Sequence, residues 1–68
     1  MIVYRYACLM RPPAPGAIPT DGLREAHQER GVAPSGHAAH GYCDYTRELT
    51  ELETDAYELE YLLSFEDE

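Results

Sequence analysis

The fold is decided by residues 44–68, which read DYTRELTELETDAYELEYLLSFEDE. This segment holds ten carboxylates and a single cationic side chain, Arg47. It also holds most of the regularly spaced large apolar residues, which we expect to be buried: Leu49, Leu52, Tyr57, Leu59, Tyr61, Leu63 and Phe65. The same segment therefore has to supply both a core and a strongly acidic surface.

The pattern of this segment predicts a helix followed directly by a strand. Thr50 and Glu53 form the Thr-x-x-Glu pattern of a capping box, and acidic residues fill the first turn, where the helix dipole favours them. Over residues 57–65 the large apolar side chains occupy every second position, as in a strand. The pattern also fits one continuous helix over 50–65. We predict a short helix over 50–56 followed by a strand, because the strands earlier in the chain need a partner with an apolar face.

Two further strands are predicted upstream. Residues 2–10 alternate between two largely apolar faces, which is typical of a central strand, and Arg5 there must reach solvent or pair with a carboxylate. Residues 37–45 form the second strand, in which Gly41 permits a close backbone approach or a bulge. The predicted fold class is α+β, with a small antiparallel sheet of about three strands and one short helix. Residues 1–68 are expected to form a single domain.

Residues 11–36 form a long connection that contains prolines and glycines. Its prolines end the first strand, because they cannot donate hydrogen bonds to a sheet. The polar stretch 21–30, with Asp21 as N-cap, predicts a short helix or a mobile excursion. Pro12 and Pro15 form a Pro-x-x-Pro pattern that an aromatic groove can bind, but so short a pattern favours a stiff connector.

The net charge of −8 is unevenly distributed along the chain. Residues 1–42 carry four arginines and three acidic residues, whereas residues 43–68 carry one arginine and ten acidic residues. The acidic half repels nucleic-acid phosphates and anionic membranes and attracts basic surfaces over about 8 Å at physiological salt. We therefore expect a basic protein partner, without direct binding to nucleic acid or membrane. So small a core also gains stability from a partner or from a homodimer.

The predicted partner-binding residues are Glu51, Asp55, Glu58, Glu60, Tyr57 and Tyr61. On a helix, Glu51 and Asp55 lie about one turn apart, and on a strand Glu58 and Glu60 share one face about 6.6 Å apart. Carboxylates at such spacings resemble a row of phosphates and can block a groove that binds nucleic acid. Aromatic residues among charges are also typical of protein interfaces. The alternative is an ordinary solvated face that keeps the protein soluble.

Neither a metal, a cofactor nor catalysis is expected. His37, His40 and Cys43, with the distant Cys8, are zinc-type donors, but on a strand successive members of the set point to opposite faces. The sequence shows neither a signal peptide nor an apolar run long enough to span a membrane, so we expect a cytoplasmic protein. A Cys8–Cys43 disulfide is not expected in that reducing compartment. A negative environment raises a thiol pKa, which disfavours a cysteine nucleophile. So short a chain also leaves little room for a catalytic pocket.

Three segments carry a resemblance to a known group: Tyr4-Arg5-Tyr6, Arg11-Pro12-Pro13-Ala14-Pro15-Gly16-Ala17-Ile18-Pro19, and Tyr45 with Arg47-Glu48-Leu49-Thr50. They resemble small uncharacterised proteins of bacterial mobile elements and phages. The likeness covers about half of the chain and rests on the proline segment. It implies a context rather than an activity or site residues. In that context, small acidic inhibitors of host nucleases, such as anti-CRISPR and anti-restriction proteins, are a recurring class.

The sequence thus predicts a small, acidic, non-enzymatic protein-binding module. In the context of the resemblance, it would inhibit a host nucleic-acid-binding defence enzyme through its carboxylate-rich surface. One alternative is a structural or assembly module that self-associates through its tyrosines and its proline segment. A second alternative is a small zinc-binding element.

Overall fold

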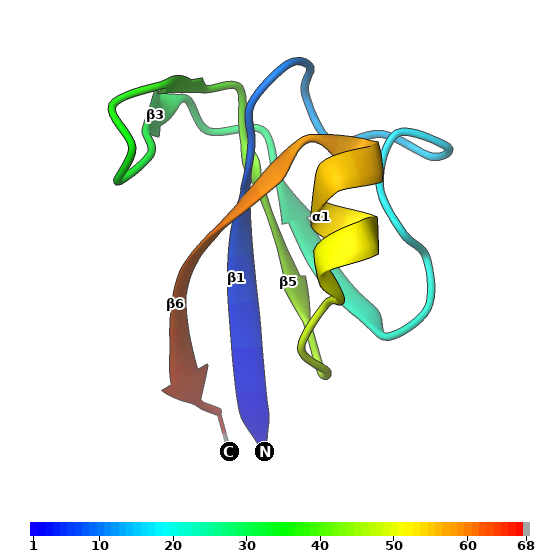
Figure 1. The fold of residues 1–68 in the computed structure, drawn as a ribbon. Helices are drawn as coiled ribbons and strands as arrows, with labels where there is room; N and C mark the ends of the chain where they lie inside the picture. Colours follow the sequence, from blue (N-terminus) through cyan, green and yellow to red (C-terminus); the bar gives the residue numbers. More distant parts are fainter. Residues whose placement is uncertain (68) are drawn as a thin grey trace.

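The computed structural model describes residues 1–67 as a four-stranded antiparallel sheet, a two-stranded hairpin and one helix (Figure 1). In chain order the elements are β1 (Ile2–Cys8), β2 (Leu23–His27), β3 (Gly31–Val32), β4 (Ala38–Ala39), β5 (Tyr42–Tyr45), α1 (Glu51–Tyr57) and β6 (Leu59–Glu66). The sheet has the order β2-β5-β1-β6, and β3 pairs with β4. The predicted α+β class with one short helix is confirmed, but the structure has more strands than the three expected.

Strand β1 lies between β5 and β6 and is antiparallel to both. Tyr6 is the register partner of Cys43 in β5 and of Tyr61 in β6. The register of the β1–β6 ladder shifts between Arg5 and Tyr6. The predicted central position of this strand is confirmed, and β1 ends at Cys8, earlier than expected.

The main core lies on the face of the sheet that packs against α1. Its buried side chains are Tyr6, Cys8, Ile18, Cys43, Tyr45, Leu49 and Leu59. The Tyr45 hydroxyl donates to the carbonyl of Pro19 at 2.6 Å, and the Leu49 N–H donates to the Tyr6 hydroxyl oxygen at 2.9 Å. The end of the proline segment and the loop before α1 are thereby both attached to the sheet.

The opposite face of the sheet carries a smaller apolar cluster. Ala7 of β1 packs there with Ala33 and Ala39, which belong to the β3–β4 excursion. All three are almost completely buried. The excursion therefore covers one end of the face that α1 leaves open.

The helix starts at the predicted N-cap and ends at Tyr57, and the strand after it begins at Leu59, two residues later than predicted. Thr50 is the N-cap, its hydroxyl oxygen accepts from the Glu53 N–H at 3.2 Å, and the Glu53 carboxylate accepts from the Thr50 N–H at 3.0 Å. Glu58 then adopts a left-handed conformation with φ of 56°, and β6 starts at Leu59. The reversal at Glu58 excludes the alternative of one helix over 50–65. In residues 1–67 no helix combines the length and the hydrophobicity needed to cross a membrane.

The helix or mobile excursion predicted over residues 21–30 is wrong, because β2 occupies the centre of that stretch. β2 pairs with β5, with Ala26 opposite Cys43 and His27 opposite Tyr42. A helix in this polar stretch would have little apolar surface to bury. A strand instead uses the free edge of β5, so its backbone hydrogen bonds are satisfied by the sheet.

The strand predicted over residues 37–45 is divided at Gly41 into β4 and β5. A Cβ atom at Gly41 would collide with the carbonyl oxygen of His27 and would lie 2.6 Å from Cδ of Pro13. The close backbone approach predicted for this glycine is therefore confirmed. The division lets β4 leave the main sheet and pair with β3.

The expectation that all the large apolar residues of the acidic segment are buried holds only in part. Leu49 and Leu59 are buried, but Leu52 is 82% exposed. Tyr61 and Leu63 are each nearly half exposed. The physical reason is that α1 is short and turns one side to solvent, while β6 forms an edge of the sheet.

Candidate functional site

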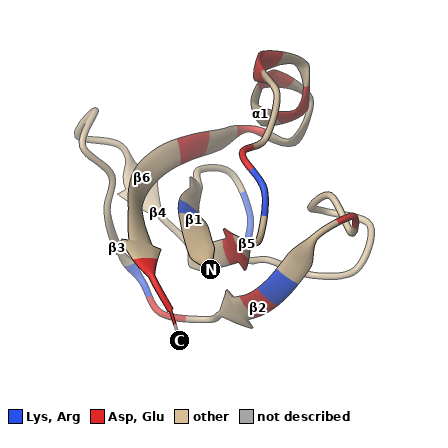
Figure 2. Cartoon of the chain, turned by 90° about the horizontal axis from the view of Figure 1, so that it is seen from below, with Lys and Arg blue, Asp and Glu red and all other residues tan. Residues whose placement is uncertain are grey.

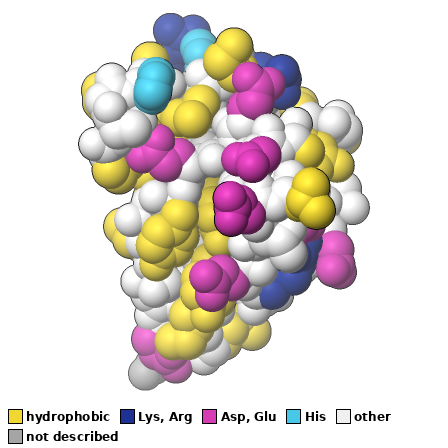
Figure 3. Space-filling model, viewed as in Figure 1, with side chains coloured by type: hydrophobic (Ala, Val, Ile, Leu, Met, Phe, Trp, Pro, Cys, Tyr) yellow, Lys and Arg dark blue, Asp and Glu magenta, His cyan; other side chains and the backbone are white. Residues whose placement is uncertain are grey.

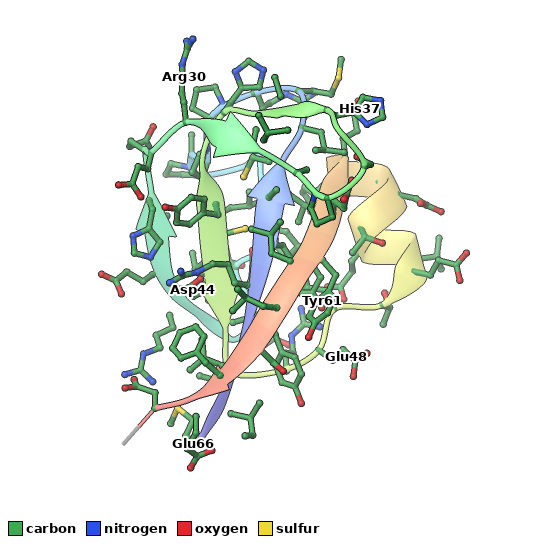
Figure 4. The ribbon with its side chains drawn as sticks, turned by 90° about the vertical axis from the view of Figure 1, so that its left-hand side faces the viewer. Arg30, His37, Asp44, Glu48, Tyr61 and Glu66 are labelled. Carbon is green, nitrogen blue, oxygen red and sulfur yellow. The ribbon has the colours of Figure 1, made fainter. Side chains whose placement is uncertain are left out.

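The carboxylates of the acidic half fall into a paired group and an unpaired group, and Asp44 is the most deeply buried of the paired ones. Asp44 is 2% exposed and lies on β5. Its Oδ1 accepts from Arg5 Nε at 2.7 Å, and its Oδ2 accepts from Arg5 Nη2 at 2.9 Å and contacts His27 Nε2 at 3.1 Å. We call these three residues the Arg5–Asp44 centre. Figure 4 shows Asp44 in the middle of the sheet, surrounded by charged and aromatic side chains.

The charges of the Arg5–Asp44 centre satisfy one another. Burial alone would raise the pKa of Asp44, but hydrogen bonds with Arg5 and His27 hold that pKa below its ordinary value. The Arg5 guanidinium also lies 5.0 Å from the ring centre of Tyr42 and 5.2 Å from that of Phe65. The sequence-based expectation that Arg5 pairs with a carboxylate is met here, and the arrangement is that of a stabilising ion pair.

A cluster of potential metal ligands lies on β2 and β5 and differs from the set considered in the sequence analysis. Among residues 1–67, ligand atoms of Glu25, His27 and Asp44 lie within 4.8 Å of one another. Both Asp44 oxygens are already bonded to Arg5, whose positive charge would repel a cation. This group is therefore poorly suited to bind a metal.

The zinc-type set considered in the sequence is not brought together. Cys43 and Cys8 are buried free thiols in the main core, whereas His37 lies in an exposed loop. The Cys8 thiol and burial together raise the pKa of Cys43, which keeps this thiol protonated. The described residues therefore do not bring this set together as the ligands of one ion.

Three more arginines pair with carboxylates of the acidic half. The pairs are Arg47 with Glu53, Arg11 with Glu58 and Arg24 with Asp67. Arg47 binds Glu53 through both terminal nitrogens, at 2.8 and 2.7 Å. These bonds, with the Thr50 N–H, lower the pKa of Glu53 from 4.5 to about 2. The fold thus cancels part of the charge asymmetry of the sequence, through contacts that sequence reasoning missed.

Two of the predicted partner-binding carboxylates remain unpaired. Glu51 and Asp55 are exposed on α1, and neither side chain makes a hydrogen bond or ion pair within residues 1–67. Leu52, at 82% exposure, lies next to Glu51 on the same solvent-facing side. We call Glu51, Leu52 and Asp55 the α1 outer face. Figure 2 shows the acidic bands of α1 at the periphery, and Figure 3 shows acidic and hydrophobic side chains next to one another on this side of the molecule.

The other four predicted residues lie elsewhere. Glu58 precedes β6 and bonds to Arg11 at 2.9 Å, while the Glu60 carboxylate accepts from the Ser35 N–H at 2.9 Å. The predicted strand face with Glu58 beside Glu60 is therefore not formed, because Glu58 caps the helix instead. Tyr57 packs against the main core. Tyr61 is 47% exposed, and its ring centre lies 5.6 Å from that of Tyr6.

A cavity of about 330 Å³ opens at the C-terminal end of α1. It is lined by Leu9, Met10, His37, Thr54, Asp55, Glu58 and Leu59. Three of these side chains are apolar and two are carboxylates, so we call the cavity the acidic pocket. Figure 4 shows His37 at the end of the molecule where this pocket lies.

Residues 1–63 match the family described as defence against restriction A C-terminal. Searches of curated proteins and of solved structures returned no match. The matched range includes the Arg5–Asp44 centre, the α1 outer face and the acidic pocket, and it supports the anti-restriction context that the resemblance implied. The chain therefore belongs to the defence against restriction A C-terminal family.

Proposed function

We propose that the chain is a non-enzymatic inhibitor that binds a basic, nucleic-acid-binding surface of a host defence enzyme through the α1 outer face. The family's description refers to defence against restriction. A restriction enzyme is a host defence enzyme that binds nucleic acid. Such enzymes bind phosphates with Lys and Arg, and carboxylates on a rigid helix offer a similar charge. The proposal thus assigns the binding energy to side chains that the fold leaves free.

The observation that carries the proposal is the unpaired state of Glu51 and Asp55. Arginines neutralise Asp44, Glu53, Glu58 and Asp67. Glu51 and Asp55 lie one helical turn apart without a counterion among residues 1–67, and like charges at this spacing cost a few tenths of a kcal/mol. A partner that supplies Lys or Arg removes this repulsion and gains attraction.

Leu52 supports this proposal over a purely solvated acidic face. A face that serves only solubility gains nothing from a leucine that is 82% exposed. An apolar anchor with a charged surround is instead typical of the centre of a protein interface. The α1 outer face combines these two properties.

The self-association alternative has less surface to use. Pro13 and Pro19 are buried against the chain itself, and so are Tyr6 and Tyr45. Part of the proline and tyrosine surface expected to mediate assembly is therefore used within one molecule, whereas Pro12 and Pro15 stay exposed. Among the tyrosines, Tyr61 is 47% exposed and lies on the edge strand β6.

The proposal is tested by a pull-down from a host lysate with tagged wild-type protein, Glu51→Arg and Asp55→Arg. Glu25→Arg is the control for the charge change, because Glu25 is also exposed but lies on β2. Its free energy of unfolding is measured as well, because Glu25 Oε2 lies 3.9 Å from His27 Nε2. We expect the wild type and Glu25→Arg to capture a nucleic-acid-binding defence enzyme, and to lose it as salt rises from roughly 50 to 500 mM. The two α1 variants should capture much less. Equal capture by all four proteins, or capture that is insensitive to salt, would contradict the proposal.

A further inference from the structure

The acidic pocket combines an apolar wall with two carboxylates. Leu9, Met10 and Leu59 supply the wall, and Asp55 and Glu58 supply the charges. Arginine has the matching character, because its long stem is apolar and its head is cationic. We propose that the acidic pocket receives one arginine side chain of the partner, with its stem on the apolar wall and its guanidinium between Asp55 and Glu58. The identity of that partner rests on the proposed function, whereas the chemistry of the pocket rests on its own lining.

The pocket opens to solvent at the molecular surface, and its volume of about 330 Å³ leaves room for one side chain of a partner. Asp55 also belongs to the α1 outer face, so the pocket continues that surface toward the end of the helix. An arginine in the pocket would therefore be anchored next to the partner contacts that we propose for Glu51 and Leu52.

Arg11 shows how a guanidinium meets this site. Its Nη2 lies 2.9 Å from Oε1 of Glu58, and the side chains of both residues are substantially exposed, at 50% and 40%. An exposed ion pair of this kind is weak and exchanges readily with another cation. Arg11 follows directly after Met10, which lines the pocket. In the free protein Arg11 thus shields Glu58, and an arginine from the partner competes with it.

Glu58 also occupies a backbone position that ordinarily favours glycine. Its φ of 56° lies in the left-handed region, which glycine adopts at helix ends without the steric cost of a Cβ atom. The Glu58→Gly substitution therefore removes the carboxylate while it relieves backbone strain. It separates loss of binding from loss of folding.

The test is an NMR titration of the full chain with N-acetyl-arginine amide, followed at the methyl groups of Leu9, Met10 and Leu59. We expect saturable shifts at these methyl groups, and none with the neutral N-acetyl-citrulline amide. Asp55→Asn should weaken the binding about tenfold. Glu48→Gln, which makes the same charge change at an exposed residue outside both the pocket and the α1 outer face, should leave the dissociation constant within about twofold.

Two further variants test the roles of Arg11 and Glu58. Arg11→Gln should tighten binding of the probe severalfold, because it removes the competing guanidinium. Glu58→Gly should weaken the binding at least as much as Asp55→Asn does, with a melting temperature equal to or above that of the wild type. Loss of binding together with a lower melting temperature would mean that the fold, not the carboxylate, was removed, and would overturn the role given to Glu58.

The proposal is overturned if Asp55→Asn and Glu48→Gln weaken binding equally, if Arg11→Gln has no effect, or if N-acetyl-lysine amide binds as tightly as the arginine probe. Each result would indicate a diffuse cation effect rather than an arginine pocket. The titration contains no host protein, so its failure leaves salt-dependent capture of a host enzyme intact. Conversely, saturable arginine binding without such capture would confirm the pocket and reject the proposed function.

Discussion

The Arg5–Asp44 centre and the α1 outer face use the same chemical group in opposite ways. Asp44 is buried and bonded through both oxygens, whereas Glu51 and Asp55 are exposed and have no counterion in the described chain, residues 1–67. The first carboxylate neutralises cations and holds strands together, and the other two leave an uncompensated field at the surface. Acidity alone therefore does not distinguish the two regions. The absence of a counterion is what sets the α1 outer face apart, and our proposal rests on it.

The largest expected effect is the loss of the Asp44 charge. In Asp44→Asn the guanidinium of Arg5 and the ring of His27 lose their anionic partner in the interior of the sheet. We expect the free energy of unfolding to fall by about 3 kcal/mol, as for other broken buried ion pairs. Urea unfolding followed by circular dichroism measures this value. A loss below about 1 kcal/mol would show that the centre is not structurally important.

Charge reversal on α1 should have the opposite profile. Asp55→Arg should leave the free energy of unfolding within about 0.5 kcal/mol, because this side chain is exposed and unpaired in residues 1–67. Glu51→Arg should lower it by no more than about 1 kcal/mol, because Glu51 lies in the first turn of α1, where the helix dipole favours an acidic side chain. Affinity for the captured host enzyme should fall at least tenfold, which corresponds to about 1.4 kcal/mol. Calorimetry with the purified enzyme gives the affinity, with Glu25→Arg as the control. Destabilisation by more than about 1 kcal/mol would place these carboxylates in the paired group instead.

Lowering the pH should reduce the free energy of unfolding that the paired carboxylates contribute. The pKa of Asp44 is depressed in the folded state despite burial, and that of Glu53 is lowered to about 2. A depressed pKa means that the unfolded chain binds the proton more tightly. The stability from these groups is therefore complete above about pH 5 and is lost as the pH falls toward 2. Urea midpoints measured from pH 7 to about 2 should show this decline. The profile of Asp44→Asn should be flatter, and a profile parallel to that of the wild type would contradict the linkage.

The smallest expected effect on stability is that of Leu52. Leu52→Ser should change the free energy of unfolding by no more than about 0.5 kcal/mol, because this side chain is 82% exposed. It should nevertheless weaken binding to the enzyme severalfold, since the interface loses its apolar anchor. Leu49→Ser, at a buried position in the same segment, should instead lower the free energy of unfolding by about 3 kcal/mol. Thermal unfolding and calorimetry of both variants make the comparison. Unchanged affinity in Leu52→Ser would remove Leu52 from the site.

The parts of the fold that the sequence predicts are those with local causes. The capping box of Thr50 and Glu53 and the alternation in β1 depend on neighbours in the chain, so the start of α1 and the central strand were identified. The strand β2 was missed because its cause is distant: its backbone pairs with β5, and His27 meets Asp44 there. No local pattern in residues 21–30 encodes that contact.

The candidate site, like the fold, is predictable from the sequence only where its residues are close together in the chain. Glu51 and Asp55 follow from helical spacing, but the contacts of Glu58 with Arg11 and of Glu60 with Ser35 join segments far apart in the sequence. Leu52 was assigned to the core because it fits an apolar stripe. Its flanking acidic neighbours were the available signal that it lies on the polar side of a short helix.

The central claim is that the α1 outer face competes with nucleic acid for one surface of the host enzyme. The most direct measurement is the fluorescence anisotropy of labelled DNA bound to the captured enzyme, with increasing amounts of this protein added at low salt. We predict that the wild type displaces the DNA, and that the Glu51→Arg and Asp55→Arg variants each need at least ten times more protein, about 1.4 kcal/mol, to do so. Binding of the wild type to the enzyme without displacement of DNA, or equal displacement by the variants, would contradict the account.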